Sequence, residues 1–252
     1  MVNNRTIKNI AWERVTKHFK SAFLLSLVPM IFTVFGVMSD HNRLNFNGND
    51  FELEPYMKTP HNIGHFLQDN WFVIFVVIIS VSLFIIVISA IMSTVTEFFT
   101  ESSISGFIDW HDTGATPETP IKAGFQLLTG MTFQIVLLRS IYTILWSFLL
   151  IVPGIVKSFS YSQAVYLYRD DLRAGRDIQT ANHYISESQK LMYGFKGQFF
   201  IMFLSLIGWY ILTLLTFGLA NIFVLPYTLA ISAEFYIALR EHQPLSEKTT
   251  VL

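Results

Sequence analysis

Two long runs without a charged residue constrain this chain more than any other feature. They extend over Ala22–Met38 and Trp71–Met92. A helix needs about 20 apolar residues to cross roughly 30 Å of hydrocarbon, so the second run is long enough and the first is just long enough. Charged residues make up 14% of the chain, whereas soluble domains carry about a quarter. The sequence therefore predicts an all-α, polytopic membrane protein.

The distribution of Lys and Arg predicts which segments face the cytoplasm, because cytoplasmic loops retain these residues. Five basic residues precede the first run, whereas the loop Ser39–Asn70 has two basic and five acidic residues. A second basic group lies between residues 169 and 196. We therefore predict that both termini and the stretch 169–196 are cytoplasmic.

The stretch LLIVPGIVKSFSYSQAVYLYRDD, Leu149 to Asp171, decides the number of crossings. Its apolar start breaks at Pro153 and Gly154, and polar residues follow. A loop here would leave the basic stretch outside the cell, so we predict a helix that returns through the membrane. Pro153 suits the first turn of that helix, where its missing N–H costs nothing.

These observations predict a single membrane domain, residues 1–252, built as a six-transmembrane-helix bundle. The spans are about 22–38, 71–94, 131–152, 153–168, 199–216 and 222–239. The loop 39–70 is extracytoplasmic, and the cytoplasmic segments are 1–21, 97–128, 169–196 and 240–252. We expect the first and third of these segments to contribute helices on the inner membrane surface, and Glu97 onward to prolong the second helix.

Two charged residues within the predicted spans are candidates for a functional or structural pair. Arg139 in the third span and Glu234 in the sixth lie at similar depths from the same side, about 12 Å by helical rise. Charges are costly there, so we predict that they pair with each other. The pair would fix helix packing or serve transport or a proton relay; alternatively, Arg139 snorkels alone to the surface.

The fourth span carries a polar stripe near helical spacing: Lys157, Ser158, Tyr161, Ser162 and Tyr168. Hydroxyl residues permit close helix contact and hydrogen bonds between helices, so the stripe is explained by packing. The alternative is a polar cavity open outward, in which Lys157 attracts an anion or headgroup. Lys157 is expected near the outer surface, where Asp50, Glu52 and Glu54 of the outer loop would meet it.

A basic set is expected to bind anionic lipid headgroups on the inner face as well as to set the topology. It comprises Arg169, Arg173, Arg176, Lys190 and Lys196. Net charge is −1 and Cys is absent, so nucleic-acid binding and thiolate metal sites are not expected. Catalytic elbows and phosphate-binding loops are not found either, and we expect no catalytic residue, metal or cofactor.

Three stretches together resemble a known family: LLIVPGIVKSFSYSQA (149–164), SESQKLMYGFKGQFF (186–200) and LIGWYILTLLTFGLANIFVLPYTLAISAEFY (206–236). They are similar to the bacterial integral membrane family catalogued as domain of unknown function 975, over about the last 130 residues. The resemblance implies a six-span membrane protein and brings no activity, substrate or catalytic residue. The chain departs from the family at residues 111–114, which are acidic where the family is usually basic.

The leading hypothesis is a non-enzymatic, multi-pass protein of a bacterial plasma membrane that acts through lipids or a membrane-protein partner. Envelope homeostasis and accessory or immunity roles fit it. The alternative is a small transporter or permease component that uses Arg139, Glu234 and the polar fourth helix. An intramembrane lipid enzyme ranks third, because no acid, base and nucleophile visibly converge.

Overall fold

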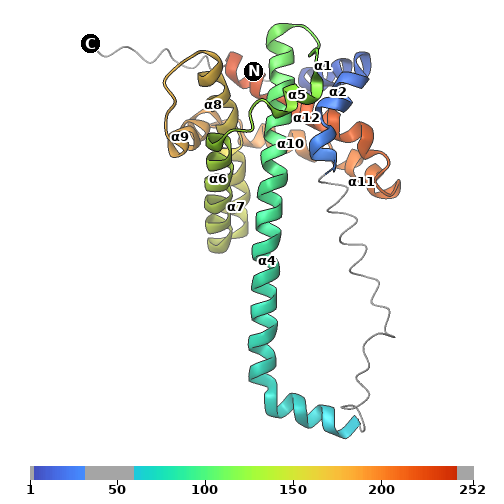
Figure 1. The fold of residues 1–252 in the computed structure, drawn as a ribbon, viewed down its shortest axis with the longest axis vertical. Coiled ribbons are helices and arrows are strands. Elements are labelled where there is room, and N and C mark those ends of the chain that lie inside the picture. The colour runs from blue at the N-terminus through green and yellow to red at the C-terminus, as the bar shows by residue number, and fades with distance from the viewer. Residues whose placement is uncertain (1–2, 32–59, 243–252) are drawn as a thin grey trace, which may run out of the picture. The chain divides into compact units, whose positions relative to one another are not determined.

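The computed structural model describes residues 3–31 and 60–242, and within these ranges it is helical without strands (Figure 1). The all-α prediction is confirmed for this part of the chain. The helices are α1 (Asn4–Lys17), α2 (Phe19–Leu25), α4 (Pro60–Thr113), α5 (Pro120–Phe125), α6 (Gly130–Leu149), α7 (Ile151–Tyr161), α8 (Ala164–Arg173), α9 (Ala181–Leu191), α10 (Lys196–Leu204), α11 (Ile207–Leu215) and α12 (Asn221–His242).

The chain divides into two compact units. The larger unit comprises residues 1–34 and 96–252, and the smaller one comprises residues 35–95. In the smaller unit, α4 presents exposed apolar side chains from Trp71 to Met92, within the predicted second span. Part of the predicted first span and most of the loop 39–70, with Asp50, Glu52 and Glu54, lie outside the described residues.

Three stretches of the described chain are long and apolar enough to cross a membrane, judged by length and composition. They are Gly130–Leu149, Lys196–Leu215 and Asn221–His242, which correspond to the predicted third, fifth and sixth spans. The predicted fourth span, 153–168, is instead divided between α7 and α8. The count of six crossings thus stays a prediction.

The core of the larger unit lies around α12. Most of this helix is buried, including Ala230, Phe235 and Tyr236. One face of α1, formed by Ile7, Ala11 and Val15 at intervals of four residues, is buried where α1 packs on α12. The amphipathic helix predicted in residues 1–21 is therefore present, but its apolar face contacts another helix.

The break near Pro153 and Gly154 lies three residues earlier than predicted. α6 ends at Leu149, Leu150 is extended with φ −160° and ψ 141°, and α7 begins at Ile151. Pro153 lies in the first turn of α7, as expected, because a helix continuing through it would lose a hydrogen bond and clash with the preceding turn. The helix boundary therefore moves upstream of the proline.

Gly154 allows the two arms of this turn to approach each other closely. A Cβ atom at Gly154 would lie 2.9 Å from Ser147 Cα, which is closer than side chains tolerate. α6 and α7 consequently pack side by side as a helical hairpin (Figure 1).

Candidate functional site

The C-terminal half of α4 carries most of the acidic side chains that hold the larger unit together. The sequence predicts that Glu97 onward prolongs the second helix, and α4 does continue to Thr113. Asp109, His111 and Asp112, in the segment 97–128 that is predicted to be cytoplasmic, lie within this helix. Glu97 and Glu101 contact a cation of α6, and Asp109 and Asp112 contact cations of α8 and α12. His111 contacts Arg14 of α1.

Arg139 of α6 is buried, with 5% of its surface exposed, between two of these acids. Its Nη2 lies 2.5 Å from Glu97 Oε1 and 2.6 Å from Glu101 Oε1. Its Nη1 donates to the carbonyl of Ser162, at 3.3 Å. Two carboxylates therefore neutralise Arg139. The sequence analysis did not identify Glu97 or Glu101 as its partners. Their spacing of four residues, just beyond the predicted second span, was the available signal.

The predicted ion pair between Arg139 and Glu234 is wrong. Glu234 is 2% exposed and accepts from Arg14 of α1, and His111 Nδ1 lies 3.3 Å from its carboxylate. The prediction assumed that α6 and α12 are neighbouring helices that both cross the membrane, so that equal depth would bring Arg139 and Glu234 together. The packing of α1 onto α12 brings Arg14 to Glu234 instead, so the two predicted partners belong to different ion groups.

A third group surrounds Arg169 of α8, which is 2% exposed. Its guanidinium contacts Asp109, Asp112 and Asp170. Arg240 of α12 joins the group, with Nη2 2.6 Å from Asp112 Oδ1. These contacts tie α4, α8 and α12 to one another.

Tyr236 completes this third group. Its hydroxyl donates to Asp170 Oδ2 at 2.6 Å, and both residues are buried. Burial of Asp112 raises the pKa of its carboxyl, but hydrogen bonds from Arg240 and Arg169 outweigh this effect, so the pKa is lowered overall. The site therefore favours the ionised carboxylate.

The structure changes the assignment of the basic set to lipid headgroups. Arg169 is buried and surrounded by carboxylates, so it is not available to a headgroup, and this assignment is corrected. Arg173 contacts Asp109, Arg176 contacts Asp171, and Lys190 contacts Glu187, each at 2.6–2.7 Å. These three side chains are about half exposed or more, and with the half-buried Lys196 they remain candidates.

The polar stripe of the predicted fourth helix mainly serves packing. Ser158 and Ser162 donate to carbonyls of their own helix, and Tyr161 is buried beside Tyr142. Tyr168 bonds Thr129 at 3.1 Å. Ser160 and Gln163, outside the predicted stripe, also contact α9: the Gln163 N–H donates to Ser188 Oγ, and Ser188 Oγ donates to the Ser160 carbonyl.

Lys157 lies in a place that the sequence did not predict. Its Nζ donates to Gln189 Oε1 of α9 at 3.3 Å and lies 4.9 Å from the ring centroid of Trp146. We expected Lys157 at the outer surface and α9 at the inner one. The hydrogen bond between Lys157 and Gln189 instead places Lys157 beside α9, so the two cannot lie at opposite membrane surfaces.

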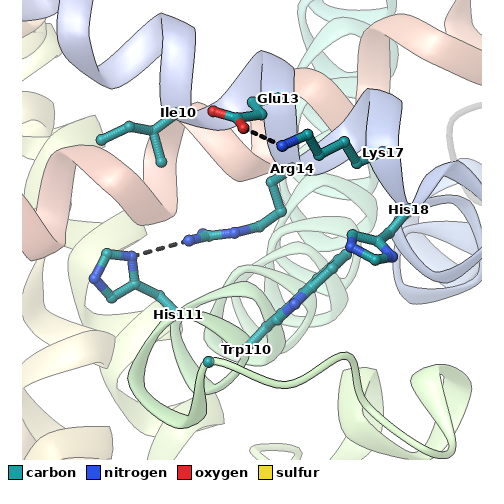
Figure 2. Close-up of a pocket in the computed structure, with 8 residues that line it drawn as sticks. Ile10, Glu13, Arg14, Lys17, His18, Trp110 and His111 are labelled. Carbon is teal, nitrogen blue, oxygen red and sulfur yellow. Dashed lines mark hydrogen bonds and ion pairs between the residues drawn. The ribbon is translucent and has the colours of Figure 1, made fainter.

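A pocket of about 250 Å³ is lined by Arg14 and His111 of the Arg14–Glu234–His111 group. Figure 2 shows these two side chains in the pocket wall. The indole of Trp110 forms one wall, with the guanidinium of Arg14 5.9 Å from its centroid. A hydrogen bond from Lys17 lowers the pKa of Glu13 at the rim. The lining residues are Ile10, Glu13, Arg14, Lys17, His18, Trp110, His111 and Gly114.

The pocket offers charges of both signs beside an aromatic face. Among the described residues, no group of three His, Asp or Glu side chains is placed to hold a metal ion. We assign no ligand to it.

A family model described as Protein of unknown function (DUF975) matches residues 74–243, which extends well upstream of the three resembling stretches. No curated protein and no solved structure matches the chain. Because the match covers more than half of the chain, this protein belongs to the DUF975 family.

Proposed function

We propose that this chain is a non-enzymatic, multi-pass protein of a bacterial plasma membrane that acts through membrane lipids or a membrane-protein partner. Envelope homeostasis or an accessory or immunity role fits this proposal. The observation that carries it is the pairing of the buried charges: Arg139, Arg169 and Glu234 each contact a group of opposite charge. Pairing of this kind stabilises helix packing, whereas transport and catalysis need groups that can exchange protons or ligands.

The alternative, a small transporter or permease component, loses its original basis because Arg139 and Glu234 lie in separate groups. Its remaining support is Glu101, a buried carboxylate beside Arg139, since carboxylates inside a membrane protein often relay protons. The two proposed functions therefore predict different results for a variant of Glu101.

A flux measurement distinguishes them. The purified protein is reconstituted in liposomes loaded with a pH-sensitive dye, and proton or ion leak is compared with empty liposomes. We expect no leak above background for the wild type or for Glu101→Gln. A flux that Glu101→Gln abolishes would overturn the proposal in favour of transport.

Lipid dependence tests the proposal directly. We expect the Tm in nanodiscs to rise when anionic lipid replaces neutral lipid, because exposed cations attract anionic headgroups. Arg176→Gln with Lys196→Gln should reduce that rise. Gln179→Ala, which leaves every charge in place at an exposed position, is the matched control. The proposal would be contradicted if the Tm were the same in every lipid composition and if no membrane-protein partner were found.

The predicted orientation, with both termini in the cytoplasm, is tested with single cysteines, because the chain has none of its own. Ala174→Cys, on an exposed position after α8, should resist an impermeant maleimide in intact cells and react after permeabilisation. Labelling of Ala174→Cys from the medium would contradict the orientation.

A further inference from the structure

The end of the α6–α7 hairpin is apolar and uncovered. No charged residue lies between Arg139 and Lys157. At the turn, the exposed fractions are 83% for Phe148, 68% for Leu149, 63% for Leu150, 75% for Ile151 and 71% for Val152. A tip that emerged into water beyond a crossed membrane would place these five side chains in water, which is unfavourable.

The base of the hairpin is marked by α9, which contacts both arms. Tyr142 of α6 donates to Asn182 Oδ1 at 3.2 Å, and Lys157 of α7 donates to Gln189 Oε1 at 3.3 Å. Asn182 and Gln189 lie seven residues apart, close to two helical turns, and so share one face of α9. α9 therefore lies across the hairpin at the level of Tyr142 and Lys157.

α9 itself belongs in water or among headgroups. Its Lys190 side chain is 73% exposed and pairs with Glu187, which is 28% exposed. A charged residue at the centre of a bilayer is unfavourable, and an exposed pair on the lipid side would be as well. The membrane boundary thus lies between α9 and the hairpin tip.

The length of the hairpin beyond this boundary is too short for a crossing. Leu149 is seven residues beyond Tyr142, and Lys157 is six residues beyond Ile151, which gives about 10 Å of helix in each arm. The hydrocarbon core is about 30 Å thick, and one leaflet contributes roughly half of it. Only one leaflet can hold this tip while α9 stays outside the hydrocarbon.

Aromatic and charged groups are placed as this arrangement requires. Trp146 and Tyr161 lie 4.9 and 5.9 Å from Lys157 Nζ, and Trp and Tyr concentrate at membrane interfaces. Arg139 is ten residues from the tip, about 15 Å, which brings it and its glutamates to the interface. A crossing hairpin would instead hold that ion group near the middle of the bilayer.

We propose that the α6–α7 hairpin is re-entrant: it dips into the acyl chains of one leaflet from the α9 side and returns to that side. This inference rests on the membrane location proposed above. It replaces the third and fourth crossings and keeps residues 169–196 cytoplasmic without them. The occupant of the exposed surface is the hydrocarbon of the inner leaflet, rather than a partner protein.

Depth measurements test this proposal. Leu150→Cys at the tip and Ala174→Cys after α8 are each labelled with an environment-sensitive fluorophore in the full-length protein. Ile78→Cys, on the exposed apolar part of α4, is the control for membrane insertion. The proteins are reconstituted in vesicles that carry nitroxides on the acyl chains or on the headgroups. Unlabelled Leu150→Cys is also treated with impermeant maleimide in intact cells and in inverted vesicles.

Re-entry predicts that acyl-chain nitroxides quench the Leu150 label more strongly than headgroup nitroxides do, and that the maleimide reacts from neither side. Reaction from the medium in intact cells would show a crossing and overturn the proposal. Reaction in inverted vesicles without quenching would place the tip outside the bilayer, as a protein-docking surface, and would also overturn it. If Ile78 is unquenched as well, the membrane location itself fails.

A second tip variant guards against a local folding defect. Val152→Cys replaces a neighbouring exposed side chain on the α7 arm. Val152→Cys should show the same quenching and the same lack of maleimide reaction as Leu150→Cys. Different results for the two variants would overturn the proposal that the whole tip enters the bilayer.

Discussion

The C-terminal half of α4 and the tip of the α6–α7 hairpin differ in both charge and coverage. Along α4, Glu101 is 6% exposed and contacts a guanidinium. At the tip, Phe148 and Ile151 are large, apolar and more than 70% exposed. Water-soluble proteins show the opposite distribution, with apolar side chains inside and charges outside.

The difference indicates what surrounds each region. Buried charges are tolerated where the chain supplies their partners, and α4 supplies four carboxylates to cations of α6, α8 and α12. Exposed apolar residues are tolerated where the surroundings are apolar, as in hydrocarbon. Each region can therefore be perturbed separately, and the expected effects differ in size.

The largest effect is expected at Arg139. Arg139→Met leaves Glu101 and Glu97 beside each other without a cation, and removal of one partner from a buried pair costs about 3–5 kcal/mol. Thermal unfolding of the purified variant in detergent checks this. Adding Glu101→Leu should recover much of the loss, because an apolar pair replaces the unpaired charge.

Lys190→Met is the matched control for this experiment. It breaks an exposed pair with Glu187, and exposed pairs contribute up to about 1 kcal/mol. Equal losses for Arg139→Met and Lys190→Met would mean that burial along α4 does not matter.

A smaller loss is expected at the hydrogen bond between Tyr236 and Asp170. Tyr236→Phe removes a buried donor at 2.6 Å from a carboxylate, and such bonds to charged groups contribute about 1.5–3 kcal/mol. Chemical denaturation monitored by fluorescence gives the difference. Tyr142→Phe removes the exposed hydrogen bond to Asn182 and should lower the free energy of unfolding by less. A larger loss for Tyr142→Phe than for Tyr236→Phe would contradict the expected order.

The hairpin is tested at Gly154. Gly154→Ala places a methyl group 2.9 Å from Ser147 Cα, and overpacking of this kind costs about 1–3 kcal/mol. Gly208→Ala in α11 is the control, since a Cβ there meets nothing within 4 Å. Helix propensity predicts that the control is neutral or stabilised by up to about 1 kcal/mol. Equal shifts in Tm would show that the arms are not in close contact.

The smallest effect is a pH dependence at Asp112. Its pKa is lowered from the ordinary value of 3.8, so the folded protein favours the carboxylate more than the unfolded chain does. This contribution is complete above pH 3.8 and is lost as the pH falls through the lowered pKa. The Tm difference between wild type and Asp112→Asn should shrink over that window.

Asp177→Asn, at an exposed position, is the control for the pH series. The Tm difference for this variant should stay close to zero throughout. A difference for Asp112→Asn that grows on acidification would contradict the assigned direction.

The sequence predicted the all-α class and the extension of the second helix beyond Glu97, because these depend on local patterns. It also placed Pro153 in a first helical turn. The partners of Arg139, Glu234 and Lys157 were not predictable in this way. Each depends on how helices distant in sequence cross, and depth counting assumed that every apolar helix runs from one surface to the other.

Two signals in the sequence were informative but unused. Glu97 and Glu101 lie one turn apart immediately after an apolar run, which places two carboxylates on one helix face. The turn Phe148–Val152 contains no polar side chain, which is unusual for a loop expected in water. The first observation agrees with the contacts of Arg139 in the structure, and the second agrees with the re-entrant hairpin proposed above.

The close approach at Gly154 has a mechanical consequence. Two helices in direct backbone contact bend together, so the hairpin tip would be a rigid insertion rather than two independently moving helices. A rigid insertion into one leaflet increases the area of that leaflet and leaves the other unchanged. This asymmetry generates curvature stress in the bilayer. Membrane shape and lateral tension would then influence this protein directly.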